Sequence, residues 1–381
     1  MTTGARYSYT DTTAQKRSVS DLIFMMDWTK APLLNIFGMT EKNARKFKLL
    51  NWPSTKAEII EDSMSPYTTT IAEDLDNSET GVDVATGTGQ YFRTGDVVKV
   101  DSEYMIVASV STDTLTVSGR GYAGSSAASH STGATIELVT RAMPEAADFT
   151  TGHTTARTAP YNYTQIISEA AQVSRTQQRM SQYAISDELD YQVTKLFNDG
   201  GNAGKLPQLL QKTFYHSLRV QRSGSANGSM GGMKTFVATN VYNLASAAIT
   251  RAAIHTAIRA IRQAGGECTH LVTGAWGIEK ITAMYEGMVR TTRDEKRGGS
   301  EITMVKTPHG EVELVYDWMC PESEYYFVNE AKVGWLPFDA FKVEEIAKRG
   351  DYYVKDVVGE YTFLVANEES HAYIYGASTT K

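Results

Sequence analysis

The stretch from Arg120 to Gly133, RGYAGSSAASHSTG, brings an arginine, a histidine and three glycines together behind an apolar, strand-like run. A glycine-rich loop binds phosphate when its glycines lead into a lysine and a hydroxyl at the start of a helix. After Gly124 the chain reads Ser-Ser-Ala-Ala, with no lysine and no helical pattern. The sequence therefore disfavours a phosphate-binding loop.

A structural role explains the same residues better. Glycines permit positive φ where a connection turns sharply, and the donors of Arg120 and His130 can bond to loop carbonyls. Gly133 lets the chain enter the next strand, TIELV. We predict a self-fastened loop that binds no ligand, with its structural residues at Arg120, Gly121, Gly124, His130 and Gly133.

Other candidate chemistry is weak. Cys268-Thr269-His270 offers two metal ligands with no second pair nearby, so a buried thiol is the better interpretation. A nucleophile elbow, G-x-S-x-G, does not occur in the sequence. We predict no catalytic, cofactor-binding or metal-binding residues, and no enzymatic activity.

Composition narrows the class of protein. The 381 residues leave room for two or three domains of ~100–200 residues each. No run of ~18 apolar residues and no signal-peptide pattern occurs, and two distant cysteines indicate reduced, cytosolic synthesis. A net charge of -7 without a basic block disfavours tight binding of nucleic acid, although such a protein can still enclose one.

The N-terminal segment is polar to Ser20 and then strongly apolar to Phe37, with Pro32 dividing the apolar cluster. Two interpretations stand: the cluster belongs to the core of this chain, or it is an arm that docks on a neighbouring subunit. The candidate interface residues on the second interpretation are Leu22, Phe24, Met25, Trp28, Leu33 and Phe37.

The remaining elements alternate in character. Short strands with apolar alternation run from Gly81 to Thr140. A helix follows Ser186 and is interrupted by NDGGNAG before KLPQLLQKTFYHSLRV resumes it. An α/β region then predicts a strand at KTFVAT, a helix from Ala245 to Ala264, a strand at THLVTG, a helix at AWGIEKITAMYEGM and several final strands.

This order of elements resembles a major capsid protein of tailed bacteriophages. The segment EYMIVASVSTDTLTVSGRGYAGSSAASHSTGATIEL is similar to a module that recurs in phage structural proteins. NYTQIISEAAQVSRT resembles the return strand of the family's extended loop, and ISDELDYQVTKLF the start of its spine helix. The break at Asp199 to Gly204 departs from the continuous spine helix of the family.

The resemblance implies an α+β, tailed-phage/herpesvirus-type capsid fold. Its parts would be an N-terminal arm (1–45), an extended β loop (46–80 and 141–176), an inserted β-rich module (81–140), a peripheral domain with the spine helix (177–233), an α/β axial domain (234–335) and C-terminal strands that return to the peripheral domain (336–381).

The implied function is the shell of an icosahedral phage head, built from hexamers and pentamers around double-stranded DNA without cofactors or membranes. Portal, scaffolding and decoration proteins are the implied partners, with synthesis in the host bacterial cytoplasm. The alternatives are a tail or decoration protein, a β-rich carbohydrate-binding protein or an enzyme.

Overall fold

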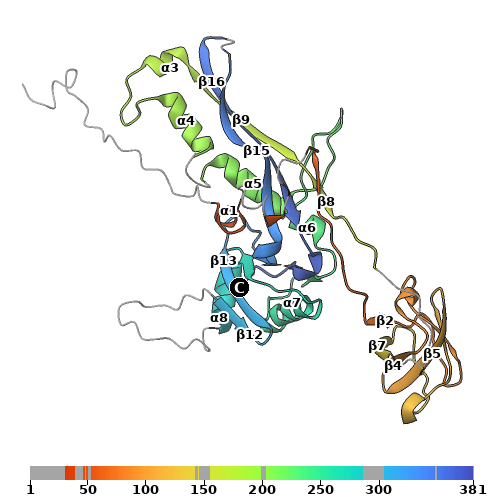
Figure 1. Ribbon diagram of the computed structural model, residues 1–381. Helices are drawn as coiled ribbons and strands as arrows, with labels where there is room; N and C mark the ends of the chain where they lie inside the picture. Colours follow the sequence, from red (N-terminus) through yellow and green to blue (C-terminus); the bar gives the residue numbers. More distant parts are fainter. Residues whose placement is uncertain are drawn as a thin grey trace, which may run out of the picture. The chain divides into compact units, whose positions relative to one another are not determined.

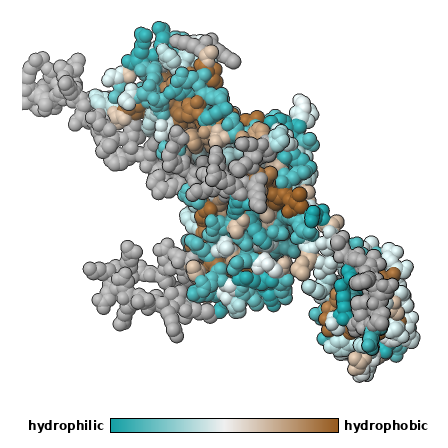
Figure 2. Space-filling view, viewed as in Figure 1, coloured by the Kyte–Doolittle hydropathy of each residue, from teal (hydrophilic) through white to brown (hydrophobic). Residues whose placement is uncertain are grey.

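The computed structural model describes residues 31–38, 46–47, 49, 53–141, 145, 155–198, 203–285, 304–347 and 350–380 (Figure 1, Figure 2). The chain divides into two compact units. We call Ile60–Thr158 the inserted unit, and Met1–Ile59 with Ala159–Lys381 the main unit. No helix in the described ranges is long and apolar enough to cross a membrane.

The inserted unit is an antiparallel sheet that closes on itself. Ala72 N donates to Asp83 O over 2.8 Å and Ala85 N to Thr70 O over 2.9 Å, which joins the two end strands. Closure leaves no free edge, so the unit is a small β-barrel. Its strands, in the order β2-β7-β4-β5-β6-β3, are β2 (Thr68–Thr70), β3 (Gly81–Asp83), β4 (Asp96–Val100), β5 (Glu103–Ser111), β6 (Thr114–Val117) and β7 (Thr135–Arg141).

Alternating side chains fill the barrel. Met105 and Val107 of β5 point inward with residues from the other strands, and Ile71 and Leu75 are equally buried. These last two lie before the expected start of the module at Gly81. The expected range of 81–140 is therefore too short for this unit, because β2 pairs with β7 and the core needs the residues that follow β2.

The first layer of the main unit combines a long three-stranded sheet with three helices (Figure 1). Helices α4 and α5 are separate because Gly204, which lies between them, has φ +116°. A Cβ built at Gly204 would lie 2.6 Å from Leu196 O. A side chain there would clash, so the break read in the sequence is retained. The elements are β9 (Gln165–Ser174), β15 (Val333–Glu345), β16 (Tyr352–Val365), α3 (Arg175–Arg179), α4 (Glu188–Leu196) and α5 (Lys205–His216), with a separate pair β1 (Lys56–Glu58) and β8 (Tyr161–Tyr163).

The second layer of the main unit is a mixed six-stranded sheet with its own apolar core. Ile254, Ile258 and Ile261 of α7 contribute one buried stripe to that core, as the sequence pattern predicts. The strands, in the order β10-β17-β14-β11-β13-β12, are β10 (Val241–Asn243), β11 (His270–Thr273), β12 (Met304–Thr307), β13 (Gly310–Tyr316), β14 (Tyr325–Val328) and β17 (Ala372–Tyr375), and the helices are α7 (Arg251–Gln263) and α8 (Ala275–Tyr285). The short helix α6 (Met233–Phe236) packs against α5 of the first layer instead.

Three local expectations fail. The segment KTFVAT holds the short helix α6 rather than a strand. The helix expected from Ala245 starts at Arg251, because Ala245 and Ser246 have positive φ and Thr250 caps the helix through Ala253 N. The C-terminal strands do not all return to one layer, since β17 pairs with β10 and β14 of the mixed sheet.

Candidate functional site

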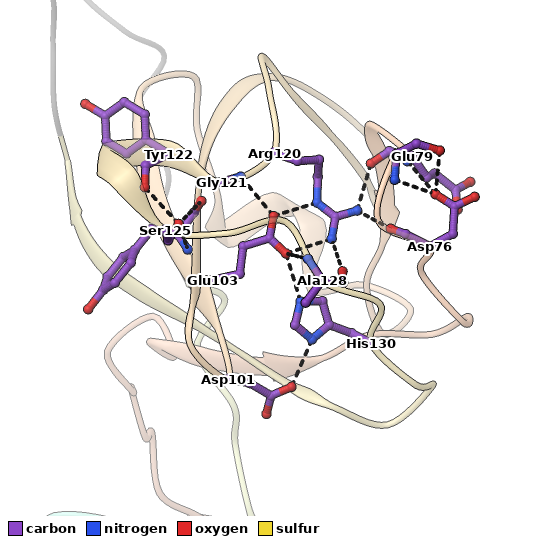
Figure 3. A network of polar contacts seen from close by, with 12 residues as sticks. Asp76, Glu79, Asp101, Glu103, Arg120, Gly121, Tyr122, Ser125, Ala128 and His130 are labelled. Atoms are coloured by element: carbon purple, nitrogen blue, oxygen red, sulfur yellow. Dashed lines mark hydrogen bonds and ion pairs between the residues drawn. The ribbon is translucent and has the colours of Figure 1, made fainter.

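The opening loop surrounds a buried cluster of charged side chains in the inserted unit (Figure 3). Glu103 starts β5, Arg120 precedes the short helix η2 (Tyr122–Gly124), and His130 lies before β7. The side chain of Glu103 is 0% exposed, and those of Arg120 and His130 are 5% and 2% exposed. We call these three residues the Glu103 cluster.

Glu103 accepts five hydrogen bonds. Arg120 Nε and Nη2 grip its two carboxylate oxygens, each over 2.8 Å. The amides of Gly121 and Ala128 donate over 3.0 Å each, and His130 Nε2 lies 3.0 Å away. A carboxylate has about four lone-pair sites, so none is left for a metal ion or a substrate.

Arg120 uses all five of its N–H donors. Besides the two bonds to Glu103, its Nη2 donates to Ala128 O over 2.5 Å, and its Nη1 donates to Glu79 O over 3.1 Å and to Asp76 O. Of these three carbonyls, only that of Ala128 belongs to the loop from Arg120 to Gly133, and the other two belong to the chain after β2. The fork geometry of guanidinium suits this combination, since a lysine offers no planar pair of donors.

His130 differs from the expectation, because its ring contacts carboxylates rather than carbonyls. Nδ1 lies 2.9 Å from the exposed Asp101 carboxylate, and Nε2 faces Glu103. Its backbone exchanges two hydrogen bonds of 2.8 Å with Leu75. His130 thus ties the loop to β5 through its ring and to the chain after β2 through its main chain.

Two of these partners were missed by sequence reasoning. Neither Asp101 nor Glu103 was among the predicted loop residues. A signal was present, because Glu103 shares the inward-facing alternation with Met105 and Val107. A carboxylate at an inward position requires a buried cation, but the sequence alone does not select Arg120, because Arg93 is closer to Glu103 in the chain.

The electrostatics follow from this geometry. Burial alone raises the pKa of Glu103, but the hydrogen bonds from Arg120, Ala128, His130 and Gly121 outweigh burial and lower its pKa to about 2. The ionised carboxylate is therefore the form that the fold stabilises. The cluster is suited to fastening a loop and not to proton transfer near neutral pH.

We expect the stability of the inserted unit to depend on Glu103 ionisation. A folded-state pKa below the unfolded value adds stability above about pH 4.5, which is lost as the pH falls toward about 2. At 1.36 kcal/mol per pKa unit, the contribution is about 3 kcal/mol. Urea unfolding of wild type and Glu103→Gln from pH 6 to pH 2.5 measures it. The cost of the substitution should shrink with acid, and a pH-independent cost would contradict this.

The glycines of the loop do not have equal roles. Gly121 has φ +68°, and a Cβ there would lie 2.5 Å from Ser125 O. Gly124 and Gly133 also have positive φ, but a Cβ at either meets no atom within 4 Å. Only Gly121 is therefore required for close approach as well as for conformation.

We expect Gly121→Val to destabilise the inserted unit by about 2–3 kcal/mol, because it adds a clash to the backbone strain. Gly124→Val is the matched control and should cost about 1 kcal/mol, since only the strain applies. Thermal unfolding, with hydrogen exchange of residues 60–141 to localise the effect, measures both. Equal costs would show that the close approach to Ser125 is unimportant.

The second candidate region, the apolar N-terminal cluster, is only partly described. Helix α1 (Pro32–Phe37) buries Leu33 and Phe37 in the core of the main unit. The ring centroid of Phe37 lies 6.1 Å from that of Phe214 and 6.4 Å from that of Trp335. The assignment of Leu33 and Phe37 to an interface is thus wrong, because the chain itself covers them. Leu22, Phe24, Met25 and Trp28 lie outside the described residues.

Polar bonds hold α1 in this core. Leu33 N donates to Gln211 Oε1 over 3.0 Å, and Gln211 Nε2 donates to Asp317 Oδ2 over 2.6 Å. Tyr215 OH donates to the same oxygen over 2.5 Å. Burial raises the pKa of Asp317, against the effect of these donors. α1 is therefore joined by a buried chain of hydrogen bonds to residues far along the sequence.

The Cys268-Thr269-His270 segment holds a buried thiol, as expected. Cys268 Sγ donates weakly to His270 O over 3.5 Å and to Val328 O over 3.9 Å. Burial raises the pKa of this thiol to about 12. A thiol that stays protonated is a poor nucleophile and a poor metal ligand.

The comparisons with known proteins find capsid proteins of phages. The model of the family described as SU10 major capsid protein matches residues 6–378. No relative is found among the curated proteins. Among solved structures, the capsid asymmetric unit of cyanophage A-1(L) matches 98% of this chain and 100% of its own at 13% identity, with a TM-score of 0.55. A solved structure from Mycobacterium phage Bobi matches 97% of this chain and 97% of its own at 10% identity, with a TM-score of 0.48.

The cyanophage match covers both units and confirms the expected capsid fold. The family model likewise extends through the inserted unit and both layers of the main unit. A family model that spans nearly the whole sequence establishes membership, and this chain belongs to the SU10 major capsid protein family, the shell-forming proteins of phage heads.

Proposed function

We propose that many copies of this chain tile into hexamers and pentamers of an icosahedral head that encloses double-stranded DNA. The observation that carries this proposal is the match of residues 6–378 to a major capsid protein family. The mixed sheet with α7 and α8 disfavours a tail or decoration protein, since such proteins are mostly β. The chain acts as a structural protein and not as an enzyme, which the saturated Glu103 carboxylate supports.

The charge distribution supports enclosure of DNA without sequence-specific binding. The inserted unit contains fourteen acidic and five basic residues, a formal charge of -9, against -7 for the whole chain. The main unit is thus close to neutral, at +2. A shell wall built from main units, each with a charge of about +2, would neither bind DNA tightly nor repel it strongly.

The head requires further partners in this proposal. A portal protein, a scaffolding protein and decoration proteins would join the shell, which would assemble in the cytoplasm of the bacterial host. The N-terminal segment before α1 would contact a neighbouring copy through Leu22, Phe24, Met25 and Trp28, because so apolar a segment is unsuited to a solvated tail.

Assembly of the expressed full-length chain tests the proposal. We would combine light scattering with negative-stain microscopy, for the chain alone and with the products of its neighbouring genes. Hexameric or larger species and closed shells are expected. A stable monomer at micromolar concentration in both preparations would overturn the proposal.

A further inference from the structure

The inserted unit has a groove that gathers most of its basic residues. The groove has a volume of about 1000 Å³, and its lining includes Arg93, Arg141 and Arg157. These are three of the unit's five basic residues, and a fourth, Arg120, is buried in the Glu103 cluster. An acidic barrel therefore carries one concave basic surface.

The arginines of the groove are not all used within the unit. Arg93 forms no side-chain hydrogen bond or ion pair with the described residues, and its Nε is buried without a partner. Arg157 is 74% exposed and, among the described residues, pairs with the exposed Asp62 over 3.4 Å. Arg141 is committed, because it pairs over 2.9 Å with the buried Asp96. Two arginines thus remain able to bind an acidic group.

Apolar and aromatic side chains adjoin these arginines. Met64 is 81% exposed and Tyr67 is 60% exposed, and both line the groove. Arginine, tyrosine and methionine are the residues enriched at protein–protein interfaces. A peptide segment with carboxylates therefore fits the groove better than a small anion, which would leave the apolar side chains in water.

The same unit also presents an acidic loop, residues 73–79, with Glu73, Asp74, Asp76 and Glu79. Its backbone is held inward at three points: Leu75 is buried and bonded to His130, and Arg120 binds the carbonyls of Asp76 and Glu79. Glu79 and Asp76 are exposed. The Glu103 cluster thus holds this loop in one conformation before it meets a partner, which lowers the entropy cost of binding.

We propose that the acidic loop of one copy docks into the arginine groove of a second copy in the assembled shell. The loop does not reach its own groove, because none of residues 73–79 lines it and hydrogen bonds from Arg120 fix the loop elsewhere on the barrel. Loop and groove are different surfaces, so the contact is heterologous and repeats around a ring of copies. This inference rests on the proposed shell function.

Reversal of both charges tests the contact in full-length protein. The groove variant is Arg93→Glu with Arg157→Glu, which spares the Arg141–Asp96 pair. The loop variant is Glu73→Arg with Glu79→Arg, which spares Asp74 and Asp76, whose carboxylates accept backbone amides. Each variant should lower the shell yield by about tenfold or more, because like charges then face each other.

The chain that carries all four substitutions should recover a yield close to that of wild type. Lys99→Glu changes the charge of the same unit outside the groove and should leave the yield unchanged. Hydrogen exchange across residues 60–141 shows that each variant remains folded. Mixed assembly of Glu79→Cys copies with size-tagged Arg157→Cys copies should give disulfide-linked pairs of unequal size.

Three results would overturn the docking. The chain with all four substitutions could assemble as poorly as the two double variants, which would mean that the groove binds another partner. Glu145 and Asp148 are the acidic residues between Arg141 and Arg157 in the sequence. Recovery of the groove variant by Glu145→Arg with Asp148→Arg would mean that the groove pairs with acidic residues of its own copy. Normal assembly of every variant would remove the groove from the interfaces. Wild-type protein that forms no shells would instead overturn the proposed function itself.

Discussion

Arg120→Met should destabilise the inserted unit by about 3–5 kcal/mol, the usual cost of leaving one partner of a buried ion pair without the other. The substitution removes the fork that grips Glu103, whose side chain is 0% exposed. It also leaves the carbonyls of Asp76, Glu79 and Ala128 without their donor. Thermal unfolding, with hydrogen exchange to assign the transition to residues 60–141, measures the effect.

Two further variants separate charge from geometry. Arg120→Lys keeps the positive charge but not the planar fork, so an intermediate loss is expected. Arg157→Met breaks an exposed ion pair with Asp62 and should cost at most about 1 kcal/mol. If Arg120→Met cost no more than Arg157→Met, the buried cluster would not be what fastens the loop.

Phe37→Ala should destabilise the main unit by about 3–5 kcal/mol, because it removes a fully buried ring from a well-packed core. Phe37 packs among Phe214, Trp335 and His270. Ile36→Ala, on the same helix, is the matched control and should cost less, because Ile36 is only partly buried. Chemical unfolding followed by tryptophan fluorescence, to which Trp335 contributes as one of five tryptophans, measures both variants.

Two truncations extend this prediction. A chain that starts at Ala31 keeps α1 and should retain the stability of the main unit while losing shell assembly. A chain that starts at residue 39 loses Leu33, Leu34 and Phe37 and should be strongly destabilised. Equal stability of the two truncated chains would show that α1 contributes little to the core, and shells formed without residues 1–30 would exclude an assembly role for that segment.

Local patterns in the sequence determined much of this protein. The glycines around Arg120 and His130 indicated a fastened loop, because positive φ is a local requirement. The stripe of Ile254, Ile258 and Ile261 indicated α7, because the helical period is fixed by backbone geometry. The break between α4 and α5 followed from the same local chemistry, and the order of elements was sufficient to suggest a capsid protein.

Only the tertiary structure determined which distant residues meet. Arg120 binds Glu103 and the carbonyl of Asp76 because the barrel closes, which no single strand encodes. Leu33 belongs to the core because its amide reaches Gln211, 178 positions later in the chain. β17 lies in the mixed sheet because it pairs with β10 and β14, which come earlier in the chain. Pairing of this kind depends on the summed burial of many side chains, and short sequence patterns carry no record of that sum.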